Sequence, residues 1–116
     1  MTIYSRLSKE TFEISTPNYE SDRKIIESII TNVEWGLHDK SALEIGEPSR
    51  YFGWTFFTVS IDVAFIAKMT EVYESFMQTK GWTYYEKFEN WLNTKLDEAG
   101  SKAQVKTVVP EFNGLF

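Results

Sequence analysis

The sequence predicts an α+β protein in which helices cover one face of an antiparallel sheet. Three observations indicate this class. Short segments alternate apolar and polar residues, three longer segments repeat apolar residues with a helical period, and the two kinds of segment are interleaved along the chain. A length of 116 residues is typical of one domain, so we expect residues 1–116 to share a single core.

One long apolar segment, residues 50–77, changes its period partway along. Its first part alternates, with Phe57, Val59 and Ile61 on one face, which is typical of a strand packed on one side. From about residue 62 to 79 the period becomes helical. The apolar stripe of this helix is Phe65, Ile66, Met69, Val72, Tyr73, Phe76 and Met77.

The first part of the chain predicts a strand and then a helix. Residues 10–15 read ETFEIS, with Phe12 and Ile14 facing inward, and Pro17 breaks the strand because its φ is fixed. We expect a helix from about 19 to 34. Its apolar stripe is Ile25, Ile26, Ile29, Ile30 and Val33.

Residues 35–49 connect this helix to the long strand. Gly36 is expected just past the helix end, where a residue in the left-handed region is common. The short alternating segment 42–46 precedes Gly-Glu-Pro-Ser, which has turn chemistry at 46–49. We therefore expect a hairpin from 42–46 into a strand that begins near Arg50.

The last third of the chain predicts a capped helix and a final strand. Thr83 and Glu86 have the spacing of a capping box, and Gly100 is expected to end the helix. Residues 104–109 alternate as a last strand, which Pro110 stops. The apolar face of the helix carries Tyr84, Tyr85, Phe88, Trp91, Leu92, Leu96 and Ala99.

The predicted order of elements is β-α-β-β-α-α-β. With the two late helices counted as one layer, this is the split βαβ plan of ferredoxin-like folds. Such a fold places its helices on one face of the sheet and leaves the other face open. Residues 1–9 favour neither strand nor helix, and the tail 111–116 is apolar enough to pack back onto the fold.

The composition narrows the classes of function. The chain has no cysteine, which excludes disulfides, thiolate nucleophiles and thiolate metal sites. Its 17 acidic and 12 basic residues give a net charge of −5, which disfavours sequence-independent nucleic-acid binding and suits a basic partner. The first residues lack an apolar signal segment, and the longest apolar run is too short to span a bilayer. We expect a cytoplasmic protein without membrane contact.

The clearest candidate binding surface is a row of aromatic residues. Stepping back by twos from Phe56 along the predicted strand places Trp54, Phe52 and Arg50 on the face away from the helices. Three rings and a guanidinium on an open sheet face can anchor a protein or stack on bases. Another part of the chain or a second subunit can also cover such a face, so a homodimer is an alternative use of this surface.

The octapeptide RYFGWTFF, residues 50–57, resembles the ribonucleoprotein-1 motif of RNA-recognition motif domains. It also falls on the strand where that family carries the motif. The resemblance implies that Arg50 contacts phosphate and that Phe52 and Trp54 stack on bases. Tyr51 stands where the motif has glycine, and the net charge of the chain is negative. We therefore rank nucleic-acid binding second.

Residue patterns for catalysis are sparse. The single histidine, His38, precedes Asp39, and such a pair can act as a base with an orienting carboxylate, but no nucleophile motif accompanies it. Glu44 and Glu47 flank the predicted turn as a candidate carboxylate pair. The glycines form no phosphate-binding or dinucleotide-binding fingerprint. We therefore expect no enzyme, no catalytic residues, no cofactor and no metal.

The sequence favours a small acidic protein-binding module. Immunity proteins that neutralise toxins and inhibitors of host defence share its short length, acidity and aromatic content. The expected mechanism is occlusion of a partner's site, with Phe52, Trp54 and Phe56 as anchors and Glu44 and Glu47 steering towards a basic site. The alternatives are single-stranded RNA or DNA binding through the same face, and a small ligand-binding ferredoxin-like domain.

Overall fold

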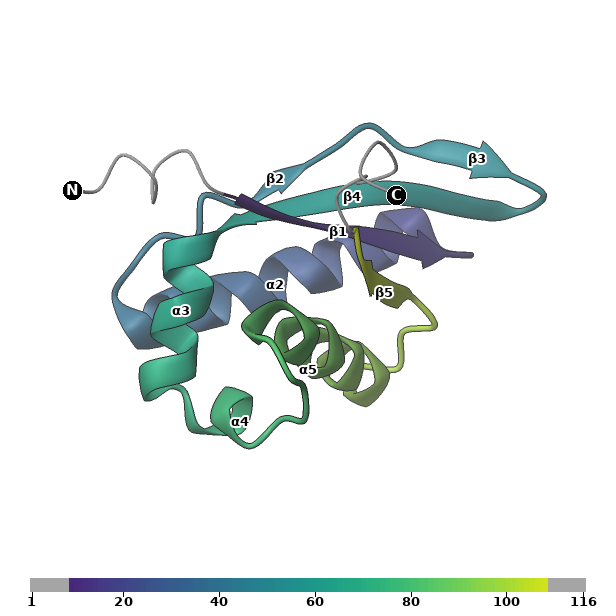
Figure 1. The fold of residues 1–116 in the computed structure, drawn as a ribbon. Helices are drawn as coiled ribbons and strands as arrows, with labels where there is room; N and C mark the ends of the chain where they lie inside the picture. The colour runs from purple at the N-terminus through teal and green to yellow at the C-terminus, as the bar shows by residue number, and fades with distance from the viewer. Residues whose placement is uncertain (1–8, 109–116) are drawn as a thin grey trace, which may run out of the picture.

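Two long strands, β1 (Lys9–Thr16) and β4 (Trp54–Asp62), form the centre of an antiparallel sheet in the computed structural model (Figure 1), which describes residues 9–108. They pair over the whole length of β1, and Ile14 lies directly opposite Phe57. Because side chains alternate between the two faces of a strand, this register combines the apolar rows of both strands on one face. The predicted inward-facing residues of both strands are confirmed as buried.

The sheet has five strands in the order β2–β4–β1–β5, with β3 also paired to β4. The shorter strands are β2 (Glu44–Ile45), β3 (Ser49–Tyr51) and β5 (Gln104–Thr107), and every pairing is antiparallel. The chain is therefore an α+β fold with an open antiparallel sheet, as the sequence predicts.

The predicted hairpin turn at 46–49 is wrong, because β2 and β3 run in the same direction along the same side of β4. Between the pairs Ile45–Val59 and Ser49–Phe56, the edge has three residues where β4 has two. The extra residue makes a bulge. The Gly46 N–H still donates to the Thr58 carbonyl at 2.8 Å, so the edge strand continues after a local bend instead of reversing.

Among residues 9–108, four helices lie on one side of the sheet (Figure 1): α2 (Tyr19–Leu37), α3 (Val63–Val72), α4 (Glu74–Met77) and α5 (Tyr84–Glu98). The main core forms between them and the sheet, and aromatic rings fill much of it. The ring centroids of Phe12 on β1 and Phe88 on α5 lie 4.8 Å apart. The largest fully buried side chains are Trp91, Phe12, Phe65, Phe76, Phe88, Ile14, Ile26, Ile30, Ile61, Ile66, Met69 and Leu92.

Helix α2 is longer than predicted. It runs through Gly36, and His38 takes the left-handed conformation at its end, with φ 53°. Leu37 is buried and extends the apolar stripe of Ile30 and Val33 by one more turn. Burial of this side chain is a sufficient reason for the helix to continue past a glycine.

The single helix predicted over 62–79 is instead two. Tyr73 has extended backbone angles between α3 and α4, with φ −101° and ψ 102°. Its ring packs edge-to-face on Trp91, with centroids 6.0 Å apart, and the Phe76 ring reaches the same indole at 6.0 Å. The break lets both rings contact α5. It also leaves Val72 and Met77, two members of the predicted stripe, exposed.

The C-terminal elements follow the prediction closely. Thr83 and Glu86 form the predicted capping box of α5, and Gly100 has φ 80° just beyond the helix. Strand β5 ends at Thr107, short of the predicted residue 109. Pro110, the tail 111–116 and residues 1–8 lie outside the described part of the chain.

Candidate interaction surface

The chain reverses between β3 and β4 through a two-residue turn at Phe52 and Gly53. Both residues have positive φ, 51° and 82°, and Tyr51 lies directly opposite Trp54. This is the geometry of a type I′ hairpin turn, in which the first position favours asparagine, aspartate or glycine. A bulky side chain is strained there. The Phe52 side chain is 85% exposed, so burial does not offset that strain.

Three exposed rings gather at this turn. Tyr51 is 65% exposed and Trp54 is 42% exposed, and the ring centroids of Tyr51 and Phe52 lie 4.4 Å apart. The end of the β3–β4 hairpin extends beyond the helices below it (Figure 1). We call Tyr51, Phe52 and Trp54 the aromatic tip. A projecting group of rings can enter a concave site on another molecule.

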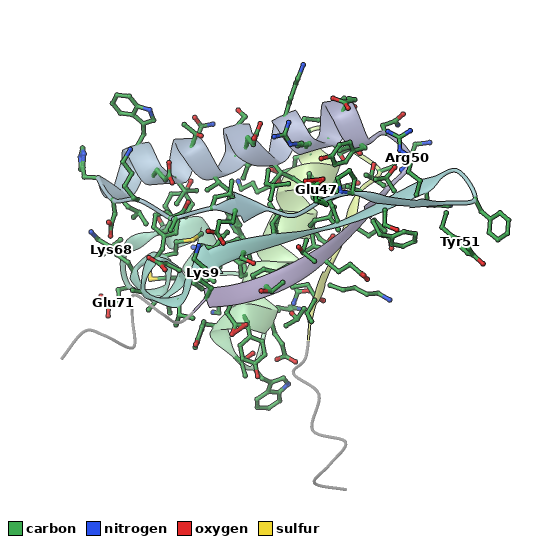
Figure 2. All side chains as sticks on the ribbon, turned by 90° about the horizontal axis from the view of Figure 1, so that it is seen from above. Lys9, Glu47, Arg50, Tyr51, Lys68 and Glu71 are labelled. Carbon is green, nitrogen blue, oxygen red and sulfur yellow. The ribbon has the colours of Figure 1, made fainter. Side chains whose placement is uncertain are left out.

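Arg50 leaves the hairpin on the side opposite to Trp54 and Phe56, so this part of the prediction is wrong. The prediction assumed one continuous strand, whereas the turn places Arg50 opposite Thr55, which is buried on the helix-facing side. Tyr51 emerges instead with Trp54 on the open side, and Figure 2 shows Arg50 and Tyr51 leaving the ribbon in opposite directions.

A groove of about 530 Å³ separates the hairpin from the start of α2. It is lined by residues 17–21 and 50–55. Arg50 and Glu20 are the two charged residues in this lining, and Arg50 makes no ion pair with any other described residue. The lining of this groove therefore combines one free guanidinium with four aromatic residues, Tyr19, Tyr51, Phe52 and Trp54.

A second hollow, of about 440 Å³, lies on the open face where the bulge crosses β4. It brings Glu47, a predicted steering residue, together with Phe56, a predicted anchor. Its full lining is Glu13, Glu47, Ser49, Tyr51, Phe56, Phe57 and Thr58. Glu44 is not part of it, because Glu44 lies opposite Ser60 and forms an ion pair with Lys9 at 3.2 Å.

The resemblance to the ribonucleoprotein-1 motif does not extend to the structure. That motif needs its aromatic residues on one face of one strand, but residues 50–57 are divided by the hairpin turn at Phe52 and Gly53. The roles that the resemblance implies for Arg50 and Phe52 therefore lose their geometric basis.

The two residues of the candidate catalytic pair, His38 and Asp39, each make a separate structural contact. His38 closes the end of α2, and the Asp39 carboxylate forms an ion pair with Lys68 at 3.4 Å and accepts the Lys40 N–H. Among residues 9–108, no three histidine or carboxylate side chains are close enough together to hold a metal ion.

Groups with shifted pKa values lie at the other end of the sheet from the aromatic tip. Burial raises the pKa of Glu10, which lies opposite Ile61. Burial also raises the pKa of Tyr84, and the nearby charges of Glu10 and then Tyr85 raise it further. Trp82 is 97% exposed, but its neighbours do not form a projecting hairpin.

Sequence reasoning missed two residues of this surface, Tyr51 and Glu13. Gly53 interrupts an alternating aromatic segment, and an isolated glycine in a strand pattern is a weak local sign of an irregularity. A turn at that place would have predicted the Tyr51–Trp54 pair. Glu13 becomes part of the surface only through the pairing of β1 with β4, which local sequence does not specify.

Neither a protein-family model, nor a curated protein, nor a solved structure matches this chain. No helix in the described part of the chain is long and apolar enough to cross a membrane. Function is therefore inferred from the chemistry of the surface itself.

Proposed function

We propose that this chain is a small acidic protein-binding module that inserts its aromatic tip into a concave site on a protein partner. The observation that carries the proposal is Phe52, a bulky residue at a turn position that favours asparagine or glycine, with its ring exposed. Such a conformation costs about 1 kcal/mol or more, and strained residues cluster at functional sites. The Phe52 ring contacts the Tyr51 ring but stays 85% exposed, so burial in the core does not offset the strain. This exposure supports a role for the ring in binding.

The neighbouring rings support the same role. Tryptophan and tyrosine are enriched among the residues that contribute most to protein–protein binding. Tyr51 and Trp54 flank Phe52 on the hairpin, so one short segment carries three anchors. We place Phe56 beside them as a partly buried support, because it lies on the same open face.

Within this proposal the mechanism is occlusion of the partner's site, and the net charge of −5 speeds encounter with a basic surface. Toxin-neutralising immunity proteins and inhibitors of host defence use such a mechanism in the cytoplasm, and we assign this chain to that functional class as an inhibitor without catalytic activity. The assignment rests on a similar length, acidity and aromatic content and not on a shared sequence motif.

We further propose that residues 1–116 form one ferredoxin-like domain. Support comes from the strand order, if β2 and β3 are counted as one edge strand interrupted by a bulge. The chain then runs β-α-β-β-α-β with its helices on one face, which is the split βαβ plan. The division into α3 and α4 is an addition to that plan.

The test is affinity capture from the native source with the wild-type chain and two single variants. Trp54→Ala removes a ring of the aromatic tip, and Trp35→Ala removes an exposed indole on α2 as a matched control. We expect one protein to be retained by the wild-type chain and by Trp35→Ala but lost with Trp54→Ala. With that protein purified, Trp54→Ala should weaken binding by about 2 kcal/mol or more. Equal capture by all three chains contradicts the proposal.

Single-stranded RNA or DNA binding remains the second candidate because the groove beside α2 combines Arg50 with aromatic rings. Bases can stack on such rings while a guanidinium contacts phosphate. Binding to an oligonucleotide pool that weakens steeply with salt, and that is lost with Arg50→Gln, would replace the protein-binding proposal with this one. A small ligand or a second copy of the chain would show itself as a co-purified molecule or as a dimer in sedimentation.

A further inference from the structure

The open face of the sheet is divided into two chemically different halves. At the end near α3, Lys9 and Glu44 neutralise each other, and the Thr11 and Ser60 hydroxyls hydrogen-bond at 3.0 Å. At the hairpin end, the hollow on the open face combines aromatic rings with carboxylates. In the first half, the polar side chains pair with one another, whereas in the second half the carboxylates lack such partners.

The two carboxylates of the hollow have no partner of opposite charge. Neither Glu13 nor Glu47 makes an ion pair or a side-chain hydrogen bond with another described residue. Lys106 lies directly opposite Glu13 on β5, yet the two groups are beyond ion-pair distance. Figure 2, which looks onto the open face, shows Glu47 and Tyr51 along the same edge segment of the sheet.

We propose that this hollow, formed by Glu13, Glu47, Tyr51 and Phe56, receives an arginine side chain from a basic segment of the partner protein. The inference rests on the protein-binding function proposed above and names the chemistry that the partner brings. A guanidinium can lie flat against a ring while its N–H groups donate to a carboxylate. The hollow offers both kinds of group, with rings of Tyr51 and Phe56 beside the two free carboxylates.

The two edges of the sheet are poor alternatives for the partner. On β5, the outer N–H and C=O of Val105 bond to the Asn93 side-chain amide at 2.9 and 3.1 Å, and the Thr107 N–H donates to Glu89 at 2.6 Å. These contacts from α5 occupy groups that an added strand would need. The other edge is interrupted by the bulge within residues 46–48, a segment that includes Pro48, and this bulge breaks the ladder into short pieces. A partner that reaches this sheet therefore meets its open face.

The test uses a short peptide with blocked, uncharged termini and two arginines separated by glycine. The peptide is titrated into the isotopically labelled full chain, and binding is followed by the amide chemical shifts of the chain. We expect shifts to concentrate at residues of the hollow. Glu13→Gln with Glu47→Gln should weaken binding roughly tenfold, since two charge-assisted contacts are lost. Glu44→Gln is the matched control and should bind like the wild-type chain, because Glu44 is already paired with Lys9.

A further variant and the pattern of the chemical shifts separate the outcomes. Lys106→Gln removes the positive charge opposite Glu13 and should strengthen peptide binding. Shifts that spread evenly over the acidic surface, or that survive the double glutamine variant, overturn the inference. Shifts that depend on the concentration of the chain alone also overturn it, since the occupant would then be a second copy.

The captured partner distinguishes failure of this inference from failure of the proposed function. If the double glutamine variant binds the purified partner as tightly as wild type while Trp54→Ala does not, the arginine site is wrong and the protein-binding function stands. If capture is independent of Trp54 but the arginine peptide still requires Glu13 and Glu47, the proposed function fails and the arginine site stands.

Discussion

The two faces of the sheet are formed by the same strands but differ in burial and in chemistry. On the helix-facing side, Phe57, Val59 and Ile61 of β4 are buried, and they pack on residues from both halves of the chain. On the open side, Trp54 is exposed and Phe56 is half-buried. A period of two can therefore build a core and a binding surface from one strand, because successive side chains point to opposite faces of the sheet.

The largest contrast between the faces should appear when neighbouring phenylalanines are truncated. Phe57→Ala should lower the free energy of unfolding by about 3–5 kcal/mol, because it leaves a cavity in the core and removes an edge-to-face contact with Tyr19 at 5.0 Å. Phe56→Ala should cost about 1 kcal/mol or less, the size of a cross-strand contact. Urea unfolding of both variants measures the difference, and equal losses would show that the open face is covered.

Two neighbouring polar residues at the end of β1, Ser15 and Thr16, also lie on opposite faces of the sheet. Thr16 faces the helices and donates its hydroxyl to the buried Asp22 carboxylate on α2, whereas Ser15 faces the open side. Thr16→Val removes the donor from a buried charge and should cost about 1–3 kcal/mol of unfolding free energy. Ser15→Ala should change it by about 0.5 kcal/mol or less. Denaturation midpoints that fall equally for both variants would contradict the assignment of faces.

At the aromatic tip, stability and binding should change in opposite directions. Phe52→Asn fits the left-handed turn position and should raise the free energy of unfolding by up to about 1 kcal/mol. The same variant should weaken binding to the captured partner, because a ring is lost. Phe52→Ala is the control, since it also removes the ring but keeps a residue disfavoured at positive φ. A gain in stability without loss of binding would mean that the ring has no role in recognition.

The smallest expected effect lies at the other end of the sheet. Burial raises the folded-state pKa of Glu10 above its ordinary value, so stability falls as pH rises between those two values and the ionised group remains unfavourable above them. Glu10→Gln should therefore raise the melting temperature slightly at neutral pH and lose this advantage in acid. It should also lower the pKa of Tyr84 towards its ordinary value, measurable by phenolate absorbance. An unchanged tyrosine titration would contradict the electrostatic influence of Glu10 on Tyr84.

Much of the fold follows from local patterns in the sequence. The alternation in β1 and β4, the isoleucine stripe of α2 and the capping box of α5 each reflect interactions within a few residues of one another, so they were predicted correctly. The errors share a different cause. The break at Tyr73 depends on Trp91, and the side taken by Arg50 depends on pairing with Thr55. Neither relation is visible in a local window.

The order of residues alone specifies which segments alternate, which repeat with a helical period, and that the protein is acidic and free of cysteine. Those properties are written into the order of side chains and require no partner. Only the tertiary structure decided where the edge strand bends, where the hairpin reverses and which charges stay unpaired. These depend on register, and a shift of one residue sends every side chain to the other face. The aromatic tip and the carboxylate hollow therefore exist as surfaces only once β3, β4 and β1 have paired.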